Sequence, residues 1–243
     1  MRLIRGMAAT LTVGAALGAA AAVANSVPLL LGEGGRARAD RGAWSQTAEF
    51  ASLILDSGWA WATMAVAVGW MVSSGLRPVV GVLGGALGGC VALIDATIVY
   101  DVVPMLFPFD EGFGWGQMPF WLVASLVLGL PLGAVGATIR RPGPVGILAA
   151  LVAPVGAALN MVVLPPPAES PVADSVMLTV WVGAATATVL VLAVRAGRRG
   201  IAGPFTGQYR PPSAGISGRQ RSPGCLPRAG FRASRPAERD LQN

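Results

Sequence analysis

Histidine is absent from this 243-residue chain, and only two cysteines are present, Cys90 and Cys225. Without histidine the chain lacks the usual general base, the commonest zinc ligand and the Ser-His or Cys-His pair of hydrolases. Cys90 lies in an apolar segment and Cys225 in a basic one, so we expect no intrachain disulfide and no cysteine-ligated metal. No nucleotide-binding loop is present either. We therefore predict a non-enzymatic protein with no catalytic residue, no cofactor and no metal.

Charge is also scarce, at 12% of residues, while 53% are hydrophobic. An average soluble domain is about 25% charged, so this chain cannot give a fold of its size a polar coat. All 18 basic residues are arginine, and ten of them lie in residues 195–243, which carry a net charge of +8. The positive charge therefore belongs to the C-terminal tail, and we expect no nucleic-acid partner.

Long apolar runs are what the chain has in abundance. A membrane-spanning helix needs about 20 mostly apolar residues. Six stretches meet or approach that length, at about 7–31, 57–75, 79–100, 118–138, 145–164 and 175–194. We predict an all-α membrane fold, with a bundle of six transmembrane helices over residues 1–195 and the lipid bilayer around it.

The first stretch has an alternative interpretation, because Ala22-Val23-Ala24 is an acceptable signal-peptide cleavage site. A typical signal core has about 7–15 apolar residues and this run has about 25, so we favour a retained helix. If residues 1–24 were cleaved, five spans would remain. Residues 44–55 predict a short helix at the membrane interface, followed by Asp56 as the N-cap of the second span.

The distribution of arginine predicts the orientation, since positive residues concentrate in cytoplasmic segments. With the N-terminus inside, nine arginines near the spans lie inside and three outside, the latter being Arg36, Arg38 and Arg41. We predict a multi-pass plasma-membrane protein with both termini cytoplasmic. Residues 196–243 are rich in Arg, Pro and Gly, which predicts a disordered tail. Its arginines could bind anionic lipid, or the tail could simply be solvated.

Small residues recur at every fourth position in several spans. In lipid, such stripes let helix backbones approach closely. The predicted packing glycines are Gly14, Gly18, Gly81, Gly85, Gly89, Gly129 and Gly133. A shorter stripe of the same kind is formed by Gly183 and Ala187. We expect these stripes to pack within the bundle, with a homodimer face or a transport seam as the alternative.

Four polar residues are the candidates for an intramembrane site. Asp95 lies among apolar neighbours in the third span, where a charged Asp costs about 2.5–3.5 kcal/mol at a helix centre. The other three are Asp56, Asp101 and Asn160. In the six-span arrangement, Asp56, Asp95 and Asp101 all lie toward the outer face and could line one vestibule, although Asp56 also suits a cap and Asp101 a loop. Pro131 and Pro154 should kink their spans.

Four short runs carry a resemblance to a known family: FASL at 50–53, SGWAW at 57–61, FWLV at 120–123 and GLPLG at 129–133. With their apolar surroundings, over about residues 5–195, they resemble a family of uncharacterised actinobacterial multi-pass membrane proteins. The resemblance implies a helical membrane fold and no particular activity.

Two functions of different classes fit this sequence. The first is a non-enzymatic membrane component that packs with or recruits a partner, either a second copy or another membrane protein. The second is a small transporter or a proton- or cation-coupled permease that uses Asp95. We favour the first because it requires fewer features that the sequence does not show.

Overall fold

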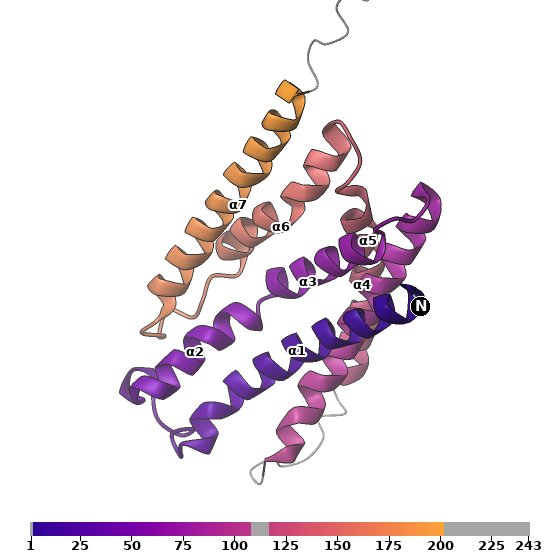
Figure 1. Ribbon diagram of the computed structural model, residues 1–243. Coiled ribbons are helices and arrows are strands. Elements are labelled where there is room, and N and C mark those ends of the chain that lie inside the picture. Colours follow the sequence, from indigo (N-terminus) through magenta and orange to yellow (C-terminus); the bar gives the residue numbers. More distant parts are fainter. Residues whose placement is uncertain (1, 108–116, 202–243) are drawn as a thin grey trace, which may run out of the picture. The chain divides into compact units, whose positions relative to one another are not determined.

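The computed structural model describes residues 2–107 and 117–201, and every regular element in these two stretches is a helix (Figure 1). The seven α-helices are α1 (Arg2–Leu30), α2 (Ala43–Leu55), α3 (Gly58–Val72), α4 (Pro78–Val102), α5 (Met118–Thr138), α6 (Pro144–Val163) and α7 (Ala173–Ile201). Two short 3₁₀ turns, η1 (Arg38–Asp40) and η2 (Val103–Leu106), complete the described elements. The predicted all-helical membrane fold is confirmed.

Five of these helices are long and apolar enough to cross a membrane, namely α1, α4, α5, α6 and α7. They coincide with five of the six predicted spans. The last helix continues past the predicted end at 194 to Ile201, so the first residues of the predicted tail are helical. The rest of that tail, 202–243, lies outside the described residues.

The second predicted span, 57–75, corresponds to the short helix α3. α3 has only 15 residues, about 22 Å of helix, which falls short of a bilayer core. α2 and α3 together are long enough, but they are bent by 54° at the break between Leu55 and Gly58. The predicted interfacial helix is therefore α2, and the pair counts as a sixth span if it crosses as one bent unit.

The packing of α1 against α4 shows the direction in which the bent pair runs. Gly14 lies against Ala92, Gly18 against Ala96, and Asn25 is hydrogen-bonded to Tyr100. The paired residue numbers rise together, so α1 and α4 run in the same direction. Two consecutive long helices can be parallel only if the chain between them returns to the starting end. We conclude that α2 and α3 carry it back, which gives six passages through the bundle.

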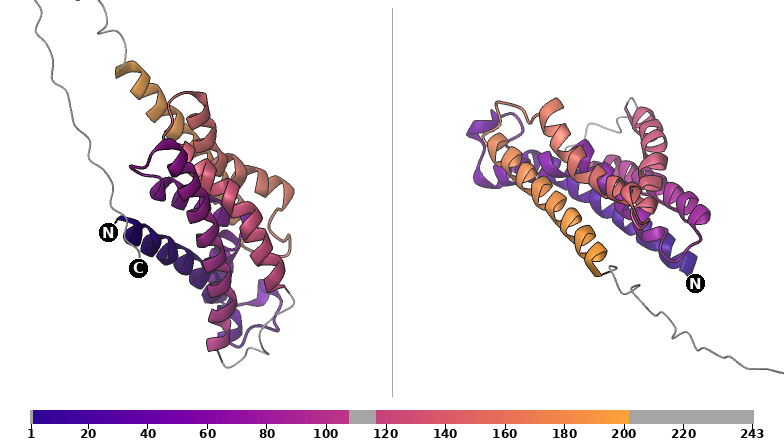
Figure 2. Two further views of the ribbon diagram at one scale, coloured as in Figure 1. Left: turned by 90° about the vertical axis from the view of Figure 1, so that its right-hand side faces the viewer. Right: turned by 90° about the horizontal axis from the view of Figure 1, so that it is seen from above.

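Glycine contacts hold α3, α4 and α5 together, and Figure 2 shows α4 and α5 side by side in both views. A Cβ added at Gly89 would lie 2.8 Å from the carbonyl oxygen of Gly129, and one at Gly85 would lie at the same distance from that of Gly133. Gly69 of α3 approaches Gly133 as well. Six of the seven predicted packing glycines face another helix in this way, whereas Gly81 faces only Ser73 and Leu76 near the start of its own helix.

α6 and α7 form a hairpin at the side of this core. Their shared buried cluster comprises Ala157, Met161, Val176, Val180 and Ala184. α7 is the least buried of the five long apolar helices. The turn before α6 contains Gly143 with a φ of 85°, a left-handed conformation that glycine adopts without strain. Such a turn lets α6 start immediately after α5 ends.

Candidate functional site

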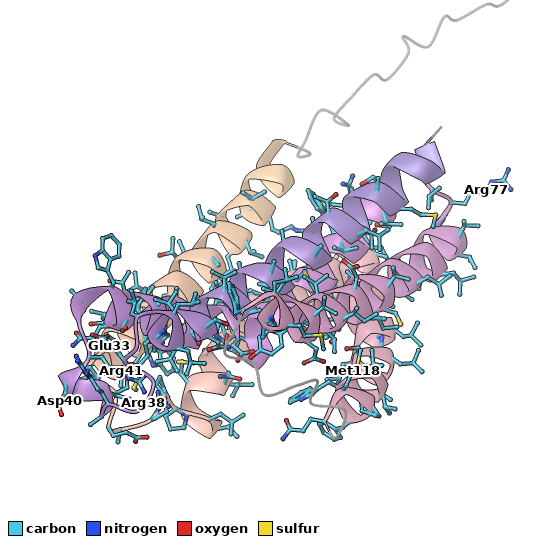
Figure 3. All side chains as sticks on the ribbon, turned by 90° about the horizontal axis from the view of Figure 1, so that it is seen from below. Glu33, Arg38, Asp40, Arg41, Arg77 and Met118 are labelled. Atoms are coloured by element: carbon cyan, nitrogen blue, oxygen red, sulfur yellow. The ribbon has the colours of Figure 1, made fainter. Side chains whose placement is uncertain are left out.

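The two ends of the bundle differ in their charged residues. One end, called the arginine end, carries Arg77, Arg140, Arg141 and Arg195. The guanidinium carbon of Arg140 lies 4.6 Å from the ring centroid of Trp70, a cation–π contact. Arg195 of α7 donates hydrogen bonds to three carbonyl oxygens of the α5–α6 turn and the start of α6, those of Ile139, Arg141 and Gly146. Figure 3 shows Arg77 at the opposite end from Glu33, Arg38 and Arg41.

A hydrogen-bonded group at the other end joins three elements. The Tyr100 hydroxyl of α4 donates to Asp56 Oδ2 at 3.0 Å. Asn25 of α1 uses its amide nitrogen to contact both the Tyr100 oxygen at 2.7 Å and Asp56 Oδ2 at 3.1 Å. Ser52 of α2 donates to the Asn25 side-chain oxygen. These four residues, Asn25, Ser52, Asp56 and Tyr100, are called the polar cluster below.

The prediction that Asp56 caps the second span is wrong. α3 begins at Gly58, its N-cap residue is Ser57, and no side-chain hydrogen bond caps that helix. Asp56 instead ends α2, where its N–H bonds to the carbonyl oxygen of Ser52. The bend between α2 and α3 turns its carboxylate toward α1 and α4, and Tyr100 and Asn25 supply the donors that the α3 amides would have supplied.

The two remaining aspartates lie on α4 and differ in their surroundings. Asp101 follows Tyr100 in the chain, so it stays at the same end as the polar cluster. Asp95 is more than a helical turn deeper and lies against α1, with its Oδ2 atom 2.8 Å from where a Cβ on Gly14 would be. Among the described residues, neither Asp95 Oδ2 nor Asp101 Oδ2 has a hydrogen-bond partner, although both atoms are buried. Asp56 and Asp101 thus gather at one end, while Asp95 is enclosed between two helices.

Two cavities flank Asp56. One, of about 260 Å³, lies toward α6 and is lined by Asn160, Gly58 and the three prolines 165–167. The other, of about 360 Å³, lies toward the 31–42 loop and is lined by Asn25, Arg38, Arg41, Glu49, Ser52 and Asp56. The predicted candidates Asp56 and Asn160 therefore share a cavity wall. The two cavities together present positively charged arginines, negatively charged carboxylates and the neutral Asn160 side chain, a set that suits the binding of a polar ligand.

The 31–42 loop is folded by its own ion pairs. Glu33 accepts hydrogen bonds from the Ser45 hydroxyl at 2.5 Å, the Gly42 N–H at 3.0 Å and Arg36 at 3.3 Å. The Ser45 bond, followed by the Gly42 bond and the Arg36 and Arg41 charges, lowers the pKa of Glu33 below its ordinary value. Arg38 donates to Glu49 at 2.8 Å. Arg36, Arg38 and Arg41, the three arginines that the predicted orientation places outside, all lie in this loop and contact Glu33 or Glu49.

Several residues of this end were missed by the sequence reasoning. Asn25 interrupts an apolar run in the same way as Asn160, so the sequence could have indicated it as a candidate too. Glu49 is 5% exposed and lies on a short amphipathic helix, where a single acid gives no sign of burial. Tyr100 lies at the end of the third predicted span, and nothing in the sequence tells that its hydroxyl meets Asp56.

Comparison of the chain with protein-family models, with curated proteins and with solved structures finds no match in any of the three. Within residues 2–107 and 117–201, no three His, Cys, Asp or Glu side chains come together in a way that could hold a metal ion. The candidate site is therefore defined by its own geometry, as a polar end with two cavities on an apolar helical bundle.

Proposed function

We propose that this chain is a non-enzymatic component of the plasma membrane that pairs with a second copy of itself through α7. The observation that carries the proposal is that the small-residue stripes of three helices are covered by other helices, whereas, within the described residues, the stripe of α7 is not. Those of α1, α4 and α5 are covered by other helices of the same chain, at Gly14, Gly18, Gly85, Gly89, Gly129 and Gly133. A Cβ on Gly183 of α7, by contrast, would meet no described atom within 4 Å.

The composition of this α7 face favours a helix over lipid as its neighbour. Thr179, Gly183 and Thr186 lie on one side of α7 at helical spacing, and all three are exposed. Membrane helix interfaces are enriched in Gly, Ser and Thr because these residues allow close backbone approach. A flat face of this kind is complementary to itself, so the same face of a second copy fits it in a two-fold pair.

The test is the oligomeric state of the full chain in lipid vesicles, measured by energy transfer between two labelled populations over a range of protein-to-lipid ratios. We expect transfer for the native chain and its loss for Gly183→Leu, whose side chain holds the two helices apart. Ala185→Leu is the matched control, because residue 185 is exposed and points away from Gly183 on the same helix. A native chain that stays monomeric, or equal transfer in both variants, would contradict the proposal.

The orientation belongs to the same proposal. The arginine end is placed at the cytoplasmic leaflet because positive residues are retained on that side. The basic residues beyond Arg195 then also lie at the cytoplasmic face, where they are attracted to anionic lipid headgroups. The polar cluster, its two cavities and the 31–42 loop face the outside.

A proton- or cation-coupled permease is the second candidate, and the buried Oδ2 of Asp95 favours it. An ionisable group without a described partner inside a span is a typical proton-carrying position. Reconstituted vesicles with an internal pH dye test this function. A proton flux that is present in the native chain and lost in Asp95→Asn supports the permease, whereas vesicles as tight as protein-free ones exclude Asp95 from such a role.

A further inference from the structure

The larger cavity at the polar end contains an unsatisfied buried acceptor. Glu49 is 5% exposed, and its Oε1 atom accepts a hydrogen bond from Arg38 at 2.8 Å. Its Oε2 atom is buried and has no hydrogen-bond partner among the described residues, and the nearest Arg41 nitrogen lies 4.0 Å away. This spacing makes an ion pair without a hydrogen bond, and a buried charged acceptor that lacks a hydrogen bond is costly, so Oε2 still has room for a donor from a bound molecule.

Charges of both signs line this cavity. Arg38 and Arg41 contribute two positive charges, and Glu49 and Asp56 contribute two negative ones. A simple cation would be repelled by the guanidinium groups, and a simple anion by the carboxylates. A molecule that carries a donor cation and an acceptor anion a few bonds apart satisfies both pairs at once.

The position of the cavity points to the source of such a molecule. Its wall includes Ala24 and Pro28 from the last turns of α1, whose apolar span ends at Leu30, and Leu53 from α2. The cavity therefore lies where a span leaves the apolar core of a bilayer, which is the depth of lipid headgroups. Its volume of about 360 Å³ lies within the range of small-ligand sites, about 300–1,000 Å³.

We propose that this cavity binds an ammonium–phosphate zwitterion, the phosphoethanolamine headgroup of a membrane phospholipid. The ammonium group donates hydrogen bonds to Glu49 Oε2 and to the Asp56 side of the cavity. The phosphate accepts hydrogen bonds from Arg38 and Arg41, whose planar guanidinium groups match its oxygens. The apolar stretch of wall at Pro28 and Leu53 takes the glycerol end of the lipid. This inference does not depend on pairing through α7, because no described residue of α7 lines the cavity.

The experiment is native mass spectrometry of the full chain in detergent, with phosphatidylethanolamine or phosphatidylglycerol added at equal concentration. We expect retention of the phosphatidylethanolamine, weakened about tenfold or more in Arg38→Gln, since a charge-assisted hydrogen bond to phosphate is lost. Arg36→Gln is the matched control, because Arg36 pairs with Glu33 and does not line the cavity. Leu53→Trp fills the space and keeps every charge, so it should also abolish retention even if a charge variant disturbs the loop.

Each outcome decides the proposal. Equal retention of the two lipids, or retention that survives both Arg38→Gln and Leu53→Trp, overturns it. Displacement of the bound lipid by free phosphoethanolamine supports recognition of the headgroup itself. If free phosphoethanolamine binds and the lipid does not, the site takes a soluble solute and the assignment to a membrane lipid is wrong.

Discussion

At the scale of single residues, the polar cluster shows how an apolar bundle accommodates a carboxylate. Asp56 Oδ2 receives hydrogen bonds from both Tyr100 and Asn25, so the charge is solvated by α1 and α4. The Tyr100 ring also packs edge-on against Trp61, at 5.9 Å between centroids. Tyr100 therefore fastens α4 to α1, to the end of α2 and to α3, and its hydroxyl group is the part that can be removed without changing the packing.

We predict that Tyr100→Phe lowers the free energy of unfolding by about 1 kcal/mol. Hydrogen bonds between membrane helices average about 0.6 kcal/mol and reach about 1.7, and this change removes two of them, the bond to Asp56 and the bond from Asn25. Thermal unfolding in detergent, followed by circular dichroism, measures the effect. Thr12→Val is the control, because the Thr12 hydroxyl bonds only to the Ala8 carbonyl of its own helix. If both variants melt together with the native chain, the polar cluster does not hold the helices.

A pH dependence follows from Glu33. Its pKa is lowered in the fold by the Ser45 hydroxyl first, then by Gly42 N–H and the nearby arginines. A group with a depressed pKa contributes stability above its unfolded pKa, about 4.3 for glutamate, and loses it as the pH falls through the folded value. We expect the melting temperature of Glu33→Gln to lie below that of the native chain at pH 7, with the difference closing below about pH 4. A difference that is constant from pH 7 to pH 3 would contradict this assignment.

Which of these residues the sequence could identify depends on the kind of signal each one gives. A polar residue within an apolar run is visible, so Asp95 and Asn160 were found and Asn25 could have been. The partner of each residue was not predictable, because hydropathy carries no information on how a helix is rotated about its axis. Asp56 illustrates this limit: Asp before a helix start is a common cap, and only the bend after α2 decides that it faces Tyr100 instead.

At the scale of helices, close backbone contact is the main device of the fold. Gly89 and Gly133 bring α4 and α5 so near that a Cβ on Gly89 would lie 2.7 Å from the Gly133 Cα. Lipid gives little hydrophobic drive for helices to associate, so contacts of this kind provide the dispersion energy instead. The same argument covers α1, which uses Gly14 and Gly18 against α4.

We predict that Gly133→Ala destabilises the protein by about 1–3 kcal/mol, because its methyl group would be forced against the Gly85 carbonyl in a filled contact. Gly156→Ala is the matched control. No described atom lies within 4 Å of its added Cβ, so it should be neutral or gain up to about 1 kcal/mol from helix propensity. Unfolding by sodium dodecyl sulfate in mixed micelles measures both. Equal behaviour of the two variants would remove glycine packing as the cause of the tight α4–α5 contact.

The helices themselves were largely predictable, since runs of about 20 apolar residues leave few alternatives. The stripes on α1, α4 and α5 were also visible, because glycine every fourth residue is a strong pattern. Gly69 and Gly136 were missed, although both make tight contacts. Gly69 has Ala65 and Ser73 four residues before and after it, so the wider small-residue pattern could have revealed it. The sequence could not tell which stripe packs against which, and only the structure gives these pairings.

At the scale of the whole molecule, we propose that the bundle crosses the membrane six times, with the arginine end and the polar end on opposite sides. The parallel packing of α1 and α4 requires the bent α2–α3 pair to return the chain along the bundle between them, which supports the sixth crossing. α3 is too short to span a bilayer by itself, so its length is also compatible with a re-entrant segment that returns to the same side. The number of crossings therefore depends on this one pair.

Reporter fusions after residues 45, 77, 142, 170 and 200 test this claim most directly, with one enzyme active only outside the cell and another active only inside. Our account predicts outside at 45, inside at 77, inside at 142, outside at 170 and inside at 200. Signals from the same side at 45 and 77 would contradict it, because α2 and α3 would then form a re-entrant segment and α1 and α4 could not run in parallel.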